Sequence, residues 1–416
     1  MWKRWRIRIL IFLAVLGPGF ITANVDNDSG GIFTYSQAGA QYGYKLLWTM
    51  IPITIALIVV QEMCARMGVV TGKGLSDLIR EEFGLRLTFV LMVVLVVVNY
   101  TNVVTEFIGI AGSMHLFHVA KFISVPICAL LVWALVLRGD YKSTEKIFLV
   151  ASLVYIAYIF AGVLSQPNWH QALLATVELP AKSVWNDKSY IYMAVGVVGT
   201  TIAPWMQFYL QSSVVEKGIP VKDYPASRLD VVAGCFFTDL IAWFIVVACA
   251  ATLYVHGMGA IRVAADAAEA MRPLAGDYAF ILFAFGLFNA SLFAASILPL
   301  STAYTVCEGL GVESGVDKSF KEAPFFYWLY TLLIVGGAVT VLVLPDSQLI
   351  NVAILSQVLN GVLLPVVIIL ILLLINRTDL MGKHKNSRLW NWIAWSTSII
   401  VIGMTVAMLW GMMPGH

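Results

Sequence analysis

The chain has 416 residues, of which 60% are hydrophobic and 12% are charged, and its net charge is +2. Soluble globular proteins carry about 25% charged residues, so this composition excludes a soluble globular domain, and the small net charge gives no indication of nucleic-acid binding. Apolar runs of about 20 residues, the length needed to cross hydrocarbon, recur along the chain. We therefore predict an all-α polytopic membrane protein and not a β-barrel, whose strands would be short alternating segments.

Eleven candidate spans follow from these runs. They are about 8–41 (interrupted), 45–68, 87–113, 118–137, 147–165, 189–213 (interrupted), 229–255, 275–305, 324–344, 348–376 and 390–412. The connecting loops are too short for a soluble domain, so residues 1–416 are predicted to form a single transmembrane domain. The basic start leads into polar residues and not into a small-residue cleavage site, so we expect no cleavable signal peptide.

The basic residues predict the orientation. With the N-terminus placed in the cytoplasm, 20 of the 26 Lys and Arg residues fall on the inner side, as the positive-inside rule requires. An odd number of spans then places the C-terminus outside. We expect a multi-pass protein of the plasma membrane.

The first span is interrupted by the polar segment NVDNDSGG at 24–31. Charged side chains are costly in a membrane and indicate function, and non-helical backbone is tolerated there only when it is buried in protein or lines a cavity. The flanking apolar runs are each short for a full span. We therefore favour a broken helix, unwound at Ser29-Gly30-Gly31, over a short loop in water between two helices.

The sixth span has a matching interruption at Gly199-Thr200-Thr201, followed by Pro204, which removes a backbone donor. Interrupted first and sixth helices are typical of an inverted repeat of five plus five helices that binds its substrate between the breaks. This pattern predicts a secondary transporter. The repeats would cover about 8–165 and 189–376, with an extra helix at about 390–412.

The sequence resembles the NRAMP family of divalent metal transporters, which have the LeuT fold. The resemblance rests on GPGF at 17–20, QAGAQYGYKLLW at 37–48, EMCARMGVVTGKGLSDLIRE at 62–81 and TEFIGIAGS at 105–113. This ordered series covers the first three helices closely, and the similarity extends along most of the chain.

The resemblance also implies a metal site and shows how this chain departs from it. The family's Asp-Pro-Gly-Asn motif falls on Asp28-Ser29-Gly30-Gly31, and its Met-Pro-His motif falls on Ala203-Pro204-Trp205. The carboxylate is kept as Asp28, while the amide ligand becomes Gly31 and the thioether becomes Ala203. Thr200 occupies the place of the residue that offers a backbone carbonyl.

These departures favour a hard ion. A thioether selects soft transition metals, whereas Mg²⁺ prefers oxygen ligands and retains several waters. Both replacements are also large-to-small, which would enlarge the pocket around a partly hydrated ion. The pattern looks like the NRAMP-related magnesium transporter branch, with Mg²⁺ as the expected substrate and Mn²⁺ as a second ion.

Proton coupling is not expected. Glu106 matches the family's third-helix glutamate, but Val103 stands at the aspartate position and Trp205 at the first sixth-helix histidine. The second histidine falls on Leu210 or Gln211. A relay needs titratable groups in series, so Glu106 is interpreted as the remnant of a proton pathway and transport as uncoupled.

Other polar residues in the spans leave alternatives open. Gln357 and Asn360 would offer oxygens to the ion or its waters, or make interhelical hydrogen bonds. Asp26 would lie behind the ligands or in the outer vestibule, or cap the next half-helix. Asp239 and Glu308 are interpreted as packing residues in preference to substrate ligands.

Three rival functions remain. A proton-coupled Mn²⁺/Fe²⁺ importer has the same fold, and an organic-substrate permease with the LeuT fold would not need Asp28. An enzyme or a channel is disfavoured because no catalytic motif or selectivity filter is present. No cofactor and no nucleic-acid partner are expected, and the bilayer and the transported ion are the predicted partners, without a required oligomer.

Overall fold

The computed structural model describes residues 17–138, 150, 156–257, 259–262, 264–316 and 318–412, and within these ranges the chain forms helices and no strand. Eight helical stretches among them are long and apolar enough to cross a membrane. The predicted all-α membrane architecture is therefore confirmed. The count of eleven spans stays a prediction, because residues 8–16 and most of 147–155 lie outside the described ranges.

The helices follow one another along the chain with short connections. The α-helices are α2 (Pro18–Asn24), α3 (Ser29–Tyr42), α4 (Met50–Thr71), α5 (Leu75–Phe83), α6 (Leu85–Leu116), α7 (Lys121–Arg138), α9 (Ile156–Leu164), α10 (Trp169–Val177), α11 (Lys188–Thr201), α12 (Pro204–Glu216), α13 (Tyr224–Cys249), α14 (Ala264–Leu310), α15 (Pro324–Val343), α16 (Leu349–Ile375), α17 (Thr378–Met381) and α18 (Arg388–Met412). Shorter 3₁₀ segments are η1 (Val25–Asn27), η2 (Gly43–Thr49), η4 (Lys182–Asn186), η5 (Val221–Asp223), η7 (Asp346–Gln348) and η8 (Gly382–His384), and η6 (Ala250–Tyr254) is a π-helical turn.

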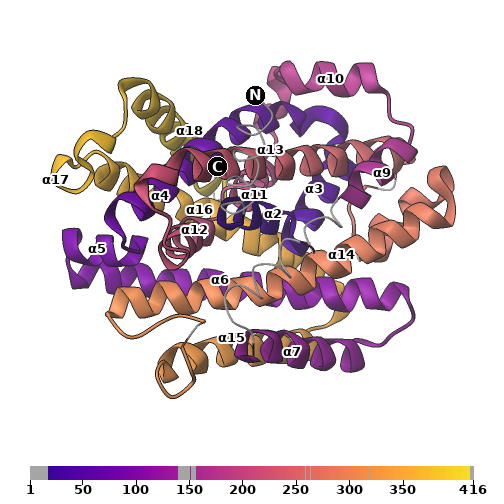
Figure 1. The fold of residues 1–416 in the computed structure, drawn as a ribbon. Coiled ribbons are helices and arrows are strands. Elements are labelled where there is room, and N and C mark those ends of the chain that lie inside the picture. The colour runs from indigo at the N-terminus through magenta and orange to yellow at the C-terminus, as the bar shows by residue number, and fades with distance from the viewer. Residues whose placement is uncertain are drawn as a thin grey trace, which may run out of the picture.

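Two long helices, α6 and α14, run side by side in Figure 1 and pack closely against each other. A methyl group built on Gly109 of α6 would lie 2.2 Å from Ser291 Oγ of α14 and 2.3 Å from Ser29 Cβ of α3. Only a glycine leaves room for this approach, in keeping with the use of small residues where membrane helices pack closely. Gly109 thus brings the start of α3 against the long pair.

The two predicted helix breaks are present. The first separates α2 from α3 and contains η1, and the second separates α11 from α12. Helix α13 packs against α2 and α3, and α16 packs against α11. The approach of α16 to α11 depends on Gly199, where a methyl group would lie 2.4 Å from the backbone nitrogen of Gly361.

Helix α2 is held at its start by a carboxylate from another helix. The buried Asp230 of α13 accepts hydrogen bonds from the backbone N–H groups of Gly17, Gly19 and Phe20, at 3.2, 2.7 and 3.2 Å. The first N–H groups of a helix have no partner within the helix. Asp230 supplies that partner and so fixes the approach to the first break.

One predicted boundary is wrong. The connector expected at 256–274 contains the beginning of α14, which starts at Ala264 and not near residue 275. The segment from Ala264 to Ala275 has several charged residues, and its hydropathy resembles that of a loop. Because a helix satisfies its own backbone hydrogen bonds, it continues past the apolar run.

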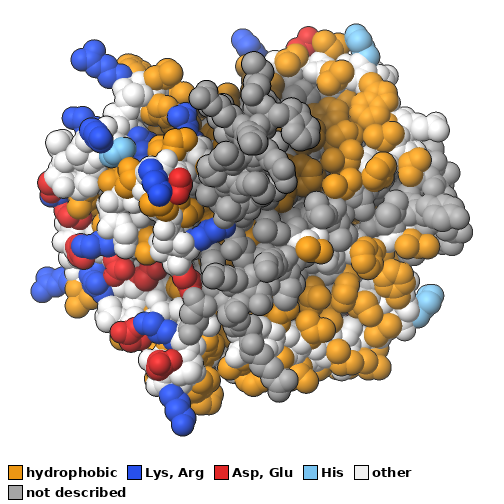
Figure 2. All heavy atoms as spheres, in the orientation of Figure 1, with side chains coloured by type: hydrophobic (Ala, Val, Ile, Leu, Met, Phe, Trp, Pro, Cys, Tyr) orange, Lys and Arg blue, Asp and Glu red, His pale blue; other side chains and the backbone are white. Residues whose placement is uncertain are grey.

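Charged side chains gather at one end of the face drawn in Figure 2, where Figure 1 places α5 and α17. The remaining described surface of that face is mostly hydrophobic. The segments at this charged end belong to the connections that the basic residues predict to lie in the cytoplasm.

Candidate functional site

The first break is capped by Asp28, the residue that precedes α3. Asp28 has an extended backbone, and its Oδ1 accepts a 2.6 Å hydrogen bond from the N–H of Gly31. This carboxylate is therefore an N-cap and supplies a partner for one of the free donors of the half-helix. The unwound residues are Val25–Asp28, so the prediction that Ser29-Gly30-Gly31 unwinds is wrong: these residues form the first turn of α3.

Ser29 ties the break to α6. Its N–H and its Oγ both lie within hydrogen-bond distance of Glu106 Oε2, at 3.2 and 2.9 Å, and the hydroxyl also lies 2.7 Å from the carbonyl oxygen of Thr105. A proline at position 29 has no N–H and no hydroxyl, so the serine adds contacts that the family's motif cannot make. In this chain Glu106 is an acceptor for the broken helix.

The second break lies at Ile202 and Ala203, where the backbone is extended at Ala203 with φ −65° and ψ 135°. Pro204 is the first residue of α12 and has no N–H to offer the carbonyl of Thr200 four residues earlier. That carbonyl therefore lacks its helical partner and is available to a ligand. Thr200 and Ala203 are each 2% exposed.

The two breaks meet. A Cβ built on Gly31 would lie 3.4 Å from Thr200 Oγ1, and the hydroxyl of Tyr35 in α3 lies 2.8 Å from Thr201 Oγ1. The structure thus brings the predicted residues Asp28, Ser29 and Gly31 together with Thr200, and Ala203 stands at the same break as Thr200. Oxygen atoms dominate this arrangement.

The enlarged pocket that we expected from the two small residues is absent beside Gly31. A Cβ there would lie 2.4 Å from the carbonyl oxygen of Asp26, so backbone fills the space that a side chain would take. Asp28 itself is only 4% exposed. In this conformation the site is closed, and room for a hydrated ion requires the half-helices to move apart.

Gln357 and Asn360 of α16 lie in an amide network. The Nδ2 of Asn360 donates to Gln357 Oε1 at 2.9 Å, and its Oδ1 accepts from Nδ2 of Asn102 at 3.0 Å. Gln357 also borders the site, because a Cβ on Gly30 would lie 2.0 Å from its Nε2. The structure therefore contains the interhelical hydrogen bonds, with Gln357 placed against the first turn of α3.

Asn102 is a residue that the sequence analysis missed. It is 1% exposed, and its Oδ1 accepts from Ser356 Oγ at 2.5 Å and from Asn360 Nδ2 at 3.0 Å. The signal was present: Asn99 and Asn102 stand three residues apart in an otherwise apolar span, which places both amides on one side of a helix.

The positions that replace the family's proton-coupling residues are buried. Val103 is fully buried and Trp205 is 1% exposed. Of the two candidates for the second histidine position, Leu210 is fully buried, and Gln211 donates from Nε2 to the carbonyl oxygen of Lys73 at 2.8 Å.

The alternatives for Asp26 can now be narrowed. Its Oδ2 accepts a hydrogen bond from the hydroxyl of Tyr35 at 3.4 Å, and Asp28, not Asp26, caps α3. The N-cap interpretation of Asp26 is therefore wrong. Glu308 lies near the end of α14, where its backbone carbonyl oxygen accepts from Arg80 at 2.8 Å, while Oε2 of its side chain has no hydrogen-bond partner among the described residues. The packing role of this side chain stays a prediction.

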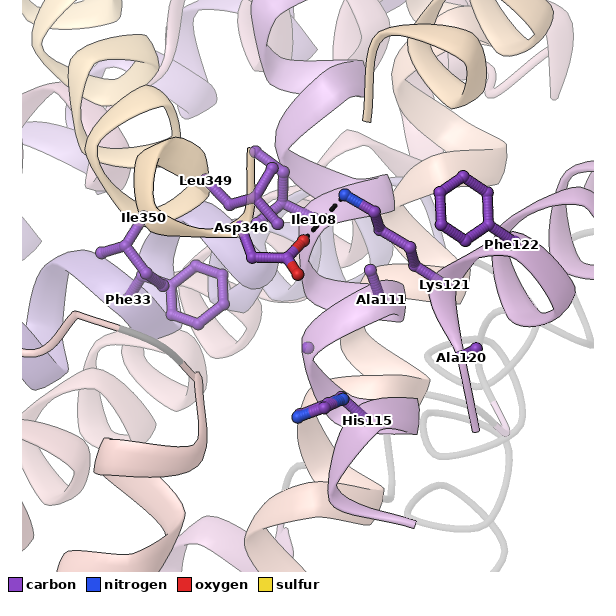
Figure 3. A pocket seen from close by; sticks show the side chains of 11 residues that line it. Phe33, Ile108, Ala111, His115, Ala120, Lys121, Phe122, Asp346, Leu349 and Ile350 are labelled. Atoms are coloured by element: carbon purple, nitrogen blue, oxygen red, sulfur yellow. Dashed lines mark hydrogen bonds and ion pairs between the residues drawn. The ribbon is translucent and has the colours of Figure 1, made fainter. Parts of the chain in front are cut away.

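A cavity of about 330 Å³ lies beside the elements that carry the site (Figure 3). It is lined by Phe33 of α3, Ile108 of α6 and Ile350 of α16, among others. The ion pair between Lys121 Nζ and Asp346 Oδ1, at 2.7 Å, stands at this cavity. The basic residues predict that Lys121 is outside, so the cavity lies on the predicted outer side of the breaks.

Several known proteins are similar to this chain over nearly its whole length. A divalent metal cation transporter MntH from Nostoc sp. is 26% identical, over 96% of this chain and 92% of that protein. The crystal structure of the Eremococcus coleocola manganese transporter, in complex with an aromatic bis-isothiourea substituted compound, superposes with a TM-score of 0.76 at 22% identity, over 96% of this chain and 86% of the other. The nucleobase-cation-symport-1 family transporter MHP1 gives a TM-score of 0.59 at 13% identity, over 95% and 92%.

These structural matches establish the LeuT fold. The family model described as "Nramp: Natural resistance-associated macrophage protein-like" matches residues 19–411, nearly the whole chain. The chain therefore belongs to the Nramp family.

Proposed function

We propose that this chain carries divalent metal ions into the cell by alternating access, with partly hydrated Mg²⁺ as its main substrate and Mn²⁺ as a second ion. Transport is uncoupled from protons and crosses the plasma membrane, with the N-terminus in the cytoplasm and the C-terminus outside. Membership of the Nramp family supports the metal class, as do relatives named divalent metal cation transporter and manganese transporter.

The donor chemistry at the two breaks carries the proposal. The carboxylate of Asp28, the free carbonyl of Thr200 and the hydroxyl of Thr200 beside Gly31 are all hard oxygen donors. Ala203 offers no thioether. Because soft sulfur favours Mn²⁺, Fe²⁺ and similar ions while Mg²⁺ is held by oxygen and water, this donor set favours Mg²⁺.

The burial of the site supports a transport cycle in which a half-helix moves. Asp28, Thr200 and Ala203 are each at most 4% exposed, so an ion reaches them only when a half-helix swings away. The breaks supply hinges, because hydrogen bonds tie Asp28 to α3 and because Pro204 has no N–H for the carbonyl of Thr200. An ion that neutralises Asp28 lowers the cost of closing the buried site around a charge.

The proposal that no protons are co-transported depends on the role of Glu106, which accepts a hydrogen bond at the break. Its Oε2 accepts from the N–H of Ser29 and lies 2.9 Å from the hydroxyl oxygen of the same residue, which supports a structural use of this carboxylate at the break. Val103 and Trp205 cannot carry a proton at the positions that they occupy. A chain of titratable groups is needed for a proton path through a membrane, and these replacements interrupt it.

A second candidate function is a proton-coupled Mn²⁺/Fe²⁺ importer. The names of the relatives favour it, because the Eremococcus coleocola protein is a manganese transporter of the same fold. The two functions differ in their substrate and in their proton movement, and both are measurable in one assay. A permease for organic substrates would have no use for the buried carboxylate of Asp28.

The test is ion uptake into proteoliposomes that contain a pH dye, with Mg²⁺ and Mn²⁺ supplied separately. We expect Mg²⁺ flux without a change in internal pH, and loss of both ion fluxes in Asp28→Ala. Asp379→Asn is the matched control, because Asp379 is an exposed carboxylate of α17, which carries neither break and does not line the cavity. Mn²⁺ flux with internal acidification and no Mg²⁺ flux would instead establish the second candidate.

A further inference from the structure

Several buried carboxylates lie outside the set of residues that the family resemblance assigns to the metal. Glu62 pairs with Arg66, and Asp230 accepts backbone hydrogen bonds at the start of α2, but Asp26 and Asp239 lack partners of this kind within the described ranges. Asp26 lies on η1 and Asp239 lies in the middle of α13. Their side chains are 1% and 4% exposed. Each belongs to an element that packs against the other.

A hydrogen-bonded pair sets the register between these elements. Asn27, which follows Asp26, donates from Nδ2 to Thr238 Oγ1 at 2.6 Å and to the carbonyl oxygen of Thr238 at 3.0 Å. Thr238 immediately precedes Asp239. The clamp joins η1 to α13, and the two aspartates lie on these packed elements within electrostatic range of one another.

Three of the four carboxylate oxygens of this pair accept no hydrogen bond of normal geometry from the described residues: Oδ1 of Asp26 and both oxygens of Asp239. The fourth accepts only a 3.4 Å bond from the hydroxyl of Tyr35. The Thr54 hydroxyl lies near Asp239 but donates to the carbonyl oxygen of Met50 at 2.7 Å. Within the part of the chain that the structure describes, neither aspartate has an ion-pair partner among the Lys and Arg residues.

The surroundings do not replace that missing partner. Asp239 lines a groove between α4 and α13 in which Thr54 is its main polar neighbour and the remaining lining is hydrophobic: Met50, Ile51, Ile55, Phe236, Leu240 and Trp243. A buried ion without a partner costs several kcal/mol, and two like charges side by side cost more. Either protonation of the pair or a cation from outside the chain removes this cost, and a count of the bound metal ions distinguishes the two.

We propose that Asp26 and Asp239 hold a second divalent cation, adjacent to the ion at Asp28. Mg²⁺ is commonly held by one or two carboxylates and completes its octahedral shell with water, and this pair offers two carboxylates with the Tyr35 hydroxyl beside them. A divalent ion also matches the two negative charges. The choice of a hard ion rests on the proposed function, whereas the existence of the site rests on the unpartnered oxygens.

The test counts metal ions per chain. The purified full-length protein is dialysed to equilibrium against MgCl₂ alone or MnCl₂ alone, and the bound metal is measured by elemental analysis. We expect two ions per chain in the wild type and one in Asp239→Asn, in Asp26→Asn and in Asp28→Asn. Asp379→Asn, a carboxylate-to-amide change at an exposed position, should keep two.

The amide variants preserve shape, and size-exclusion chromatography with a melting curve verifies that each one folds. Should Asp239→Asn fail that check, Asp26→Asn tests the same site from the opposite element. A single ion in the wild type, unchanged in both Asp239→Asn and Asp26→Asn but lost in Asp28→Asn, would overturn the second site. Bound Mg²⁺ and bound Mn²⁺ are measured in separate samples. If the uptake assay shows no Mg²⁺ flux, Mg²⁺ is refuted as the substrate, but the number of Mn²⁺ ions bound per chain still tests the second site.

Discussion

At the scale of single residues, the two small replacements at the breaks have different surroundings. Ala203 ends an extended stretch ahead of α12 and already accommodates a Cβ, but it is 2% exposed, so a longer side chain there has to displace its neighbours. Gly31 has its missing Cβ position 2.4 Å from the Asp26 carbonyl oxygen. The two positions should therefore respond differently when the family's ligands are restored.

Ala203→Met is expected to change the selectivity of the site. It returns a thioether to the break, and soft sulfur binds Mn²⁺ better than Mg²⁺. We expect the ratio of Mn²⁺ to Mg²⁺ affinity to rise about tenfold, which corresponds to about 1.4 kcal/mol. Competition of each ion against radioactive Mn²⁺ measures the change, and Ala203→Leu controls for size without sulfur. An equal shift in the leucine variant would show that volume, and not sulfur, sets the selectivity.

Glu106→Gln separates a structural carboxylate from a proton carrier. Glutamine keeps a carbonyl oxygen that accepts from Ser29, so we expect Mg²⁺ flux to stay within about fivefold of the wild type, the change that the full loss of a hydrogen bond of about 1 kcal/mol would cause. Glu106→Ala removes the acceptor of the Ser29 N–H and should lower the melting temperature. If flux depends on pH in the wild type but not in Glu106→Gln, Glu106 carries protons and the structural interpretation is wrong.

The sequence predicts which residues lie at the two breaks, but not the hydrogen bonds that they make. Asp28, Gly31, Thr200 and Ala203 were located by motif spacing, and the structure places them at two adjoining breaks. The hydrogen bonds of Asn102 and of Glu106 depend on helices that are far apart in the chain. Such contacts follow from tertiary packing, which periodicity within one helix does not encode.

At the scale of elements, proline and the polar segment predicted both breaks, but the side-chain cap determined which residues unwind. Asp28 accepts from Gly31 and so draws Ser29-Gly30-Gly31 into α3. The start of α14 at Ala264 was not predicted. Hydropathy identifies the apolar part of a helix that can lie in the membrane, and a helix can begin before that part. Lipid-facing length and helix length are different quantities.

Pro204→Ala should close the second break. Alanine restores an N–H that can bond to the carbonyl of Thr200, which removes that oxygen from the ion and stiffens the junction between α11 and α12. We expect Mg²⁺ flux to fall at least about tenfold, more than the loss of one hydrogen bond of about 1 kcal/mol would cause. Pro126→Ala in α7 is the matched control, because that proline lies inside a helix away from the breaks. An equal loss in both variants would show a general effect of proline on folding.

At the scale of the whole molecule, the structure combines a buried carboxylate at the helix breaks with a chain whose basic residues are predicted to lie mostly on the cytoplasmic side. Figures 1 and 2 place charged side chains at the end that includes α5 and α17. The inverted-repeat bounds of about 8–165 and 189–376 stay predictions, whereas the fold that relates them is that of LeuT. If no proton moves with the ion, its transport is driven by its own concentration gradient and by the membrane potential.

Uncoupled transport of a divalent ion should follow the membrane potential. Each elementary charge gains about 2.3 kcal/mol per 100 mV, so Mg²⁺ gains about 4.6 kcal/mol, and the equilibrium accumulation should rise tenfold for every additional ~30 mV, inside negative. Potassium diffusion potentials imposed on proteoliposomes at equal internal and external pH test this slope. A proton symporter would move additional positive charge and would also accumulate metal from a pH gradient at zero potential. Accumulation under that second condition would contradict uncoupled transport, because an ion that moves alone has no means of sensing the gradient of protons.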